Sequence, residues 1–267
     1  MTVIQPTSNV AGRELAPNKL ATVCLGIACP MANEGADGVR FVREVLEKCA
    51  GFRKVQFFAV LDRATTDNTL DLLREYAMTE PRLLVLWAPE NRCVVDAYVR
   101  GYREALEAGS DWILEIDAGF SHQPADIPQF FAVMQRGYDC VFGSRFMIGG
   151  SICRSSWKRY CISRCGTILT NLMMGTRLSD MTSGFEMFSR SALQMVLERG
   201  IRSRAHFFQT EIKVYCRNLK ITEVPIHYEA ASPRLHGSAV SEALSQLWRL
   251  YRLGGREVSG NAQKGVF

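Results

Sequence analysis

The sequence contains no long hydrophobic run. None of its apolar stretches approaches the roughly 18 to 20 residues that a helix needs to cross a bilayer. Residues 1–20 are polar and contain proline and asparagine, with no basic start followed by an apolar segment, so we expect no signal peptide. We therefore expect a cytoplasmic protein that is either soluble or attached to a membrane surface.

Several motifs of common enzyme classes are also missing. The sequence has no GxSxG, no GxxxxGK[ST] and no GxGxxG, which argues against the common hydrolase, kinase and dinucleotide-dependent classes. Its four histidines lack metal-ligand spacing, and its nine cysteines include no paired CxxC motif. These counts predict no zinc site, and the odd number of cysteines fits a reducing compartment.

Charge and composition allow one large α/β domain. Lysine and arginine number 32 against 27 acidic residues, an excess that suits a phosphate-bearing partner but equally serves solubility. We expect no nucleic-acid partner. With 47% hydrophobic residues, the chain can bury a sizeable core. We divide it into a polar extension (1–20), one domain (21–240), and an amphipathic helix with a flexible tail (241–267).

Short apolar runs alternate with segments of helical periodicity. This alternation predicts βαβ units, a mainly parallel sheet flanked by helices, and ligands at the carboxyl ends of the strands. The predicted strands are 21–28, 55–61, 83–87, 112–116, 140–143, 183–188 and 221–228, and the predicted helices are 39–49, 66–78, 95–108, 155–175, 207–216 and 242–253.

Acidic residues follow three of these strands. Asp117 comes directly after a buried strand, where it could meet a metal or a ribose, or simply form a turn or helix cap. Asp62 is freer for a ligand, because Thr66 and Asp67 are better placed to cap the next helix. Glu34 precedes a helix and could merely favour its positive end. Three such segments together indicate one shared site.

Basic residues follow in the second half of the domain. Arg145 ends a strand, and its guanidinium suits bidentate contact with phosphate. Lys158, Arg159, Arg164 and Arg234 could form a basic wall opposite it, although a solvated helix face is the preferred explanation for Lys158. Glu211 lies in an otherwise apolar helical stretch and needs a partner, which an arginine of the basic wall could provide.

Taken in order, these segments resemble glycosyltransferase family 2, which has the GT-A fold, and most closely its polyprenyl-phosphate sugar synthases such as the dolichyl-phosphate mannose synthases. The matching segments are PMANE at 30–34, DRATTDNT at 62–69, DAGFSHQP at 117–124, GSRF at 143–146, DMTSGF at 180–185, FQTE at 208–211 and EVPI at 223–226. The ordered set spans roughly residues 21 to 240 and is more specific than any single motif.

The resemblance implies an inverting transfer from a GDP- or UDP-sugar, such as GDP-mannose, to an acceptor, of which a polyprenyl phosphate is the first choice. It also implies roles for individual residues. Those bordering the nucleoside and diphosphate would be Pro30, Ala32, Glu34, Asp62, Asp117, Ala118 and Gly119, and those assisting transfer would be Asp117, Arg145, Arg159, Arg164, Glu211 and Arg234.

The sequence departs from the family pattern at three positions. Gly119 replaces the second aspartate of the DxD motif, Ser121 replaces a glutamine, and Val240 replaces a lysine. We therefore expect Asp117 to be the protein ligand of Mg²⁺ or Mn²⁺, with a weaker metal requirement than in relatives that keep DxD. Gly119→Asp should strengthen that requirement if the backbone tolerates a side chain.

These departures leave other functions open. The alternatives are a soluble transferase acting on a small-molecule or protein acceptor, and a nucleotide-sugar-binding subunit without turnover. The predicted helix 242–253 carries Trp248 and Tyr251 beside arginines. It could therefore contact a membrane or a membrane-embedded partner, or pack on the core.

Overall fold

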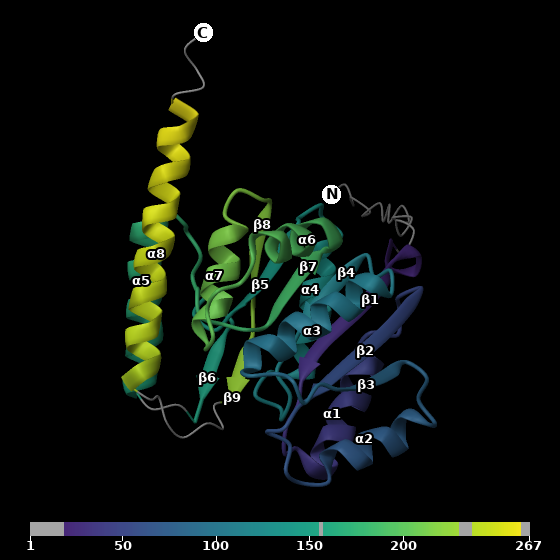
Figure 1. Cartoon of the computed structure of the whole chain (residues 1–267). Coiled ribbons are helices and arrows are strands. Elements are labelled where there is room, and N and C mark those ends of the chain that lie inside the picture. Colours follow the sequence, from purple (N-terminus) through teal and green to yellow (C-terminus); the bar gives the residue numbers. More distant parts are fainter. Residues whose placement is uncertain (1–18, 155–156, 230–236, 263–267) are drawn as a thin grey trace, which may run out of the picture.

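The computed structural model describes residues 19–154, 157–229 and 237–262, and in the last of these segments side chains are described for 241–253. Its centre is a seven-stranded sheet with the strand order β3-β2-β1-β4-β7-β5-β8 (Figure 1). These strands are β1 (Cys24–Pro30), β2 (Lys54–Leu61), β3 (Leu83–Trp87), β4 (Trp112–Glu115), β5 (Cys140–Ser144), β7 (Glu186–Ser189) and β8 (Ile221–Pro225). A separate pair, β6 (Ser151–Cys153) and β9 (His227–Glu229), forms a two-stranded sheet.

The strand order reverses beside β1. Strands β2 and β3 lie on one side of β1, and β4 lies on the other, all four being parallel. Strand β7 runs antiparallel between β4 and β5, and β8 is parallel to β5. In open α/β sheets the loops at such a reversal leave a crevice at the carboxyl ends of the strands. The loops after β1 and β4 therefore flank the expected ligand position.

Helices cover both faces of the sheet. One core lies between the sheet and α1 and α4, and a second core lies under α3, α6 and α7. Because both faces are covered, strands such as β1 read as continuous apolar runs rather than alternating ones. The helices are α1 (Gly35–Lys48), α2 (Thr69–Ala77), α3 (Val94–Glu107), α4 (Ile127–Met134), α5 (Trp157–Met174), α6 (Arg190–Arg199), α7 (Phe207–Tyr215) and α8 (Gly237–Ala262), with short 3₁₀ turns at Lys19–Thr22 and Pro124–Asp126.

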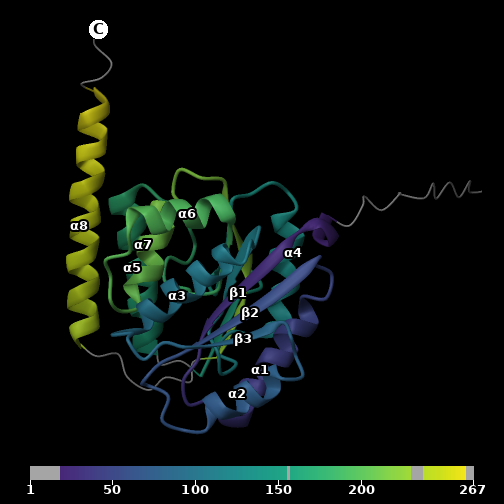
Figure 2. The same cartoon turned by 45° about the vertical axis from the view of Figure 1, so that its right-hand side comes forward.

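Helices α5 and α8 lie side by side at one end of the molecule. Both views show α8 running along α5 (Figures 1 and 2), and α8 also contacts α7. Leu247 and Leu250 of α8 are buried against the domain. The helix begins at Gly237 and continues to Ala262, so it is longer than the predicted 242–253. The glycines after Leu253 weaken a helix without blocking its hydrogen bonds, which is why they did not end it.

The predicted α/β fold class is confirmed, with three differences in detail. The predicted strand 221–228 is two strands, because Ile226 donates its N–H to Ser144 O and the chain then leaves β8 to pair with β6. Helix α4 was missed although its buried residues Ile127, Phe130, Phe131 and Met134 follow helical spacing, because a short and mostly apolar run is hard to distinguish from a buried strand. Helix α6 was also missed, although Ser189 caps it by accepting a hydrogen bond from the Ala192 N–H.

Candidate functional site

Asn33 joins the loop after β1 to the loop after β2. Its Oδ1 accepts a hydrogen bond from the Thr66 N–H at 2.8 Å, and its Nδ2 donates to Ala64 O at 2.8 Å. Thr69 Oγ1 adds a second connection by accepting from the Glu34 N–H at 2.8 Å. Asn33 has a φ of +58°, a left-handed conformation that asparagine adopts more readily than most residues. Asn33 was assigned no role from the sequence, although it stands in the matching segment 30–34.

Asp67, and not Asp62, bonds to the start of α2, as predicted. Asp67 Oδ1 accepts the Thr69 N–H at 2.9 Å at the start of α2, and hydrogen bonds from Thr69 lower the pKa of Asp67. Asp62 instead shapes its own loop, because its Oδ1 accepts the Ala64 N–H at 2.8 Å. Asp62 is half-buried at the carboxyl end of β2. Its contact with the base or ribose stays a prediction.

Asp117 is held in place from two sides. The Tyr98 hydroxyl of α3 donates to Asp117 Oδ1, and the Asp117 N–H donates to His122 Nδ1 at 3.2 Å. His122 is buried and stacks on Phe185 at 5.0 Å between ring centroids. Burial lowers the pKa of His122, and its accepting Nδ1 fits a neutral ring. The Asp117 side chain is thus fixed yet 32% exposed, which leaves it open to a ligand.

Gly119 and Glu34 meet beside Asp117. Gly119 has a φ of +70°, and a Cβ atom there would lie 2.7 Å from Glu34 Oε2. Burial, together with the carboxylates of Asp67, Asp37 and Asp117, raises the pKa of Glu34. Helix α1 begins at Gly35, before the predicted start at residue 39, so Glu34 directly precedes it.

The loops bring all the predicted nucleoside and diphosphate residues to one edge of the sheet. Pro30 is the last residue of β1 and Ala32 lies in the loop that follows it, and both are half-buried; Ala118 is buried in the loop after β4. Since β1 pairs with both β2 and β4, the three loops are neighbours. The residues gathered there are Pro30, Ala32, Glu34, Asp62, Asp117, Ala118 and Gly119.

The donor set at this edge fits a divalent cation shared with a diphosphate. Within the part of the chain that the structure describes, no three or more His, Cys, Asp or Glu side chains are grouped so that they could hold a metal alone. Mg²⁺ commonly takes only one or two protein carboxylates and completes its shell with phosphate oxygens and water. Asp117 and Glu34 offer two carboxylates whose mutual repulsion a cation would relieve.

Arg145 forms an internal ion pair, and its predicted contact with a phosphate stays a prediction. Its Nε and Nη2 donate to the two carboxylate oxygens of Asp180 at 2.7 and 2.9 Å, and Nη2 also donates to Thr182 Oγ1 at 2.6 Å. Arg145 and Asp180 are both buried. The edge of the guanidinium that was expected to hold a phosphate therefore holds Asp180.

Arg159 and Arg164 do lie near Arg145, as expected. The Arg159 guanidinium contacts Tyr228, with Nη2 at 3.3 Å from the phenol oxygen, and the Arg164 guanidinium lies 4.9 Å from the centroid of the Phe146 ring. The Arg145 guanidinium lies 5.2 Å from the centroid of the Phe146 ring and 5.4 Å from the centroid of the Tyr228 ring. Lys158 is exposed, as a solvated helix face would have it, and Arg234 lies outside the described residues.

Glu211 anchors α8 and makes no contact with the acidic residues in the loops after β1, β2 and β4 among the bonds described for it. Its carboxylate accepts hydrogen bonds from the Ser203 and Tyr215 hydroxyls, each at 2.6 Å, and pairs with Arg249 of α8. Burial alone would raise the pKa of Glu211, but the hydrogen bonds from Ser203 and Tyr215 lower it. The partner is therefore not one of the described arginines of the basic wall, and these contacts do not support the predicted catalytic role.

A buried charge network that the sequence analysis missed lies under Asp117. Glu115 and Glu186 are opposite each other on β4 and β7, and both are completely buried. Lys213 of α7 pairs with Glu186, and Tyr102 donates its hydroxyl to Glu115. Burial raises the pKa of Glu186 to about 7, although the Lys213 ammonium opposes this. The network ties the end of β4 to α3 and α7.

Comparisons with known proteins agree with this geometry. Residues 27–197 match the family model for glycosyl transferase family 2. Undecaprenyl-phosphate mannosyltransferase of Micrococcus luteus is 31% identical over 195 residues, which cover 71% of this chain and 80% of that protein. Polyprenol monophosphomannose synthase of Mycolicibacterium smegmatis is 26% identical over 191 residues, which cover 69% of this chain and 72% of that protein.

A solved structure shows the same fold. Glucosyl-3-phosphoglycerate synthase of Mycobacterium tuberculosis, crystallised with Mn²⁺, UDP and phosphoglyceric acid, aligns with a TM-score of 0.62 at 14% identity, covering 86% of this chain and 79% of that one. This likeness confirms the predicted GT-A fold, and the sequence matches confirm the family resemblance. The chain belongs to glycosyl transferase family 2.

Proposed function

We propose that this protein is an inverting glycosyltransferase that moves a sugar from a nucleotide sugar to a polyprenyl phosphate. The observation that carries the proposal is the group of acidic side chains, Glu34, Asp62 and Asp117, at the strand-order reversal where α/β proteins bind nucleotides. The names of both curated relatives describe mannose and a polyprenyl phosphate. GDP-mannose is therefore the first donor to test.

The proposed transfer is a single displacement. A phosphate oxygen of the acceptor attacks the anomeric carbon, and the bond to the nucleoside diphosphate breaks with inversion. The acceptor phosphate is already ionised near neutral pH, so positioning and charge neutralisation carry the catalysis. A bound divalent cation would neutralise charge on the leaving diphosphate. Asp117 is oriented for this by Tyr98 and His122, and Arg159 and Arg164 supply positive charge for phosphates.

The test is a transfer assay with purified protein. Radiolabelled GDP-mannose or UDP-glucose is incubated with undecaprenyl phosphate in detergent, and we expect label in the lipid extract, with inverted anomeric configuration by NMR. Label transferred only to a water-soluble or protein acceptor would contradict the polyprenyl-phosphate proposal. Donor binding by calorimetry without any transfer or hydrolysis would favour the binding-subunit alternative.

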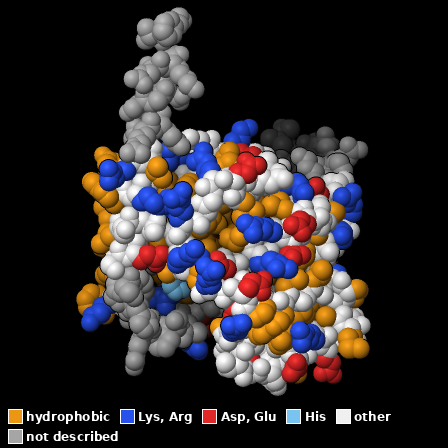
Figure 3. Space-filling model, viewed as in Figure 1, with side chains coloured by type: hydrophobic (Ala, Val, Ile, Leu, Met, Phe, Trp, Pro, Cys, Tyr) orange, Lys and Arg blue, Asp and Glu red, His pale blue; other side chains and the backbone are white. Residues whose placement is uncertain are grey.

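The surface formed by α5 and α8 could bring the protein to a lipid acceptor. Trp157 and Leu172 of α5 are 72% and 78% exposed, and Trp248 of α8 is 56% exposed. Figure 3 shows hydrophobic and basic side chains mixed on the left of this face, where Figure 1 places both helices. Such a mixture suits the interface of an anionic membrane. Among the described helices, none is long and apolar enough to span a bilayer.

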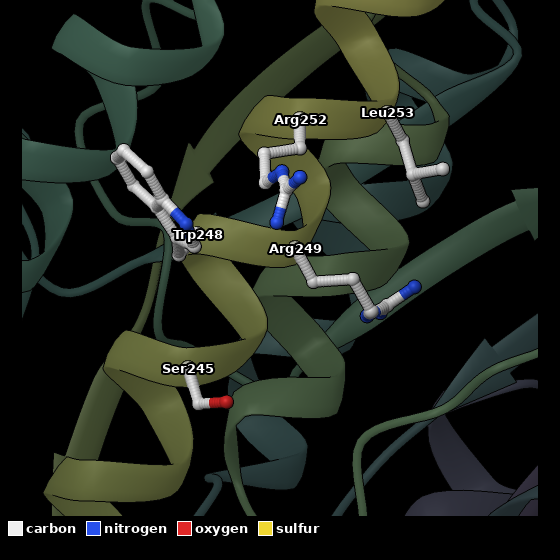
Figure 4. A pocket seen from close by; sticks show the side chains of 5 residues that line it. All are labelled: Ser245, Trp248, Arg249, Arg252 and Leu253. Atoms are coloured by element: carbon white, nitrogen blue, oxygen red, sulfur yellow. The ribbon is translucent and has the colours of Figure 1, made fainter.

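One side of helix α8 packs on the domain, and the other side is exposed and is the side we propose to contact the membrane. Its buried leucines pack on the domain, while Trp248 and Tyr251 stack on each other at 5.7 Å on the exposed side. A hollow of about 400 Å³ on this helix is lined by Ser245, Trp248, Arg249, Arg252 and Leu253. In Figure 4, Trp248 and Arg249 point to opposite sides of α8, Arg249 being the residue that pairs with Glu211.

We expect the native protein to sediment with liposomes containing anionic lipid, and the double variant Leu244→Ser with Trp248→Ser to lose at least about tenfold in membrane partitioning. Inserting one large apolar side chain is worth about 1.5–3 kcal/mol, and 1.4 kcal/mol is tenfold in an equilibrium constant. Met78→Ser is the matched control, because Met78 is 87% exposed directly after α2, away from α8. Absence of native sedimentation, or an equal loss in the control, would contradict the proposed membrane surface.

A further inference from the structure

Glu34 occupies the space that a side chain at position 119 would need. A Cβ atom at Gly119 would lie 2.7 Å from Glu34 Oε2 and 3.4 Å from Oε1, and the nearer distance is one that real Cβ atoms essentially never show. Gly119 also has a φ of +70°, which glycine adopts without strain. The two residues therefore depend on each other: the Glu34 carboxylate can rest against the β4 loop because position 119 has no side chain.

Within the part of the chain that the structure describes, the Glu34 carboxylate has no partner. Among the described residues, it makes no hydrogen bond or ion pair, whereas Asp67 and Asp117 each accept one. It is half-buried, and the nearby charges that affect it are the carboxylates of Asp67, Asp37 and Asp117. An unpaired, partly buried carboxylate among like charges is unfavourable unless a cation joins it. A diphosphate arriving at this edge would add further negative charge.

We infer that Glu34 supplies, from the start of α1, the second carboxylate that Gly119 cannot supply from the β4 loop, so that Glu34 and Asp117 together face the divalent cation accompanying the donor diphosphate. The inference rests on the proposed nucleotide-sugar function. Two carboxylates plus phosphate oxygens are a usual ligand set for Mg²⁺. Glu34 is well placed for this task, because Thr69 Oγ1 accepts its N–H and fixes its backbone.

This arrangement changes the expected effect of restoring an acid at position 119. Gly119→Asp alone would displace the flexible end of the Glu34 side chain, so one carboxylate would replace another and the metal requirement should not become stronger. The double variant Glu34→Ala with Gly119→Asp lacks the Glu34 carboxylate and carries a new carboxylate at position 119, in the loop after β4. Aspartate tolerates a left-handed backbone better than most residues. The double variant should therefore regain what Glu34→Ala loses.

The experiment measures nucleotide binding, not turnover. Kd values for GDP and UDP are determined by calorimetry with and without Mn²⁺, and the ratio of the two values is the coupling between metal and nucleotide. We expect Mn²⁺ to tighten nucleotide binding about tenfold or more in the native protein. In Glu34→Gln this factor should fall at least about fivefold. Both values lie within the range typical of linked sites. Thermal melts establish that each variant is folded.

Asp37→Asn is the matched control. Asp37 lies in the first turn of α1 and also acts on Glu34 electrostatically, but it is exposed and pairs with Arg40 at 3.2 Å. This variant should keep the native coupling. An equal loss in Asp37→Asn and Glu34→Gln would show an effect of net charge and would overturn the inference.

The remaining outcomes separate the inference from the proposed function. If the native protein binds nucleotide with a Mn²⁺ effect that Glu34→Gln retains, or without any Mn²⁺ effect, Glu34 is no metal ligand, while the proposed function stands. If the native protein binds neither GDP nor UDP under either condition, the proposed function fails and the inference fails with it. If Glu34→Ala with Gly119→Asp regains the coupling that Glu34→Ala loses, while Gly119→Asp alone shows no increase over the native protein, the inference is supported.

Discussion

Replacing Asp117 by asparagine is expected to reduce kcat/KM for sugar transfer about 100- to 1000-fold, the range seen when a preorganised electrostatic group is removed from an active site. The substitution keeps the shape of the side chain and removes its charge at the strand-order reversal. Because Asp117 is 32% exposed and follows β4, the fold should not depend on its charge. The measurements are kcat/KM with GDP-mannose and undecaprenyl phosphate, and the melting temperature, each for the variant and for the native protein. We expect kcat/KM to fall while the melting temperature stays unchanged.

Tyr98→Phe provides the graded control for Asp117. Tyr98 is buried in α3 and donates its hydroxyl to Asp117 Oδ1, so phenylalanine fits the same space while releasing that oxygen. We expect about a tenfold loss of turnover, since a hydrogen bond to a charged group contributes about 1.5–3 kcal/mol and Asp117 keeps its charge. The metal dependence should also change, because a loosened carboxylate is a poorer ligand. A loss in Asp117→Asn no larger than in Tyr98→Phe would contradict a direct role for Asp117.

The positions of the strands along the chain were predictable because burial on both faces leaves a plain sequence signal. Runs such as Leu83–Trp87 are short, apolar and bounded by polar segments, and the structure places that strand at the same residues. The acidic strand ends were predictable for the same reason, since Asp62 and Asp117 directly follow such runs. What the sequence could not show was which side chains face each other across long separations.

The roles of Arg145 and Glu211 illustrate that limit. Asp180 is 35 positions from Arg145, and Arg249 is 38 positions from Glu211. Nothing in the local pattern tells whether an arginine meets a phosphate or an internal carboxylate, because the guanidinium is equally suited to both. The contact of Glu34 with Gly119 is likewise set by the pairing of β1 with β4. From the sequence, Gly119 shows that the second aspartate of the DxD motif is missing, but it does not show that the Glu34 carboxylate lies beside that position.

The second large effect is on stability and concerns the buried pair of Arg145 and Asp180. Asp180→Ala is expected to lower the free energy of unfolding by about 3–5 kcal/mol, because it leaves a buried guanidinium without its carboxylate. Urea unfolding at pH 7 measures the change. Arg100→Ala is the control, because the exposed pair of Arg100 with Glu104 should contribute no more than about 0.5 kcal/mol.

The pH dependence of the same variants separates an ion pair from simple packing. Burial alone would raise the pKa of Asp180, but the Arg145 guanidinium lowers it below its usual value. A carboxyl group with a lowered pKa in the folded state contributes stability that is fully present above its unfolded pKa of about 3.9 and is lost as the pH falls through the folded value. The difference in unfolding free energy between the native protein and Asp180→Asn should therefore be constant near neutral pH and shrink below about pH 4. If Asp180→Asn unfolds like the native protein at pH 7 while turnover collapses, the pair is functional rather than structural, and Arg145 regains the phosphate-binding role that its sequence position suggested.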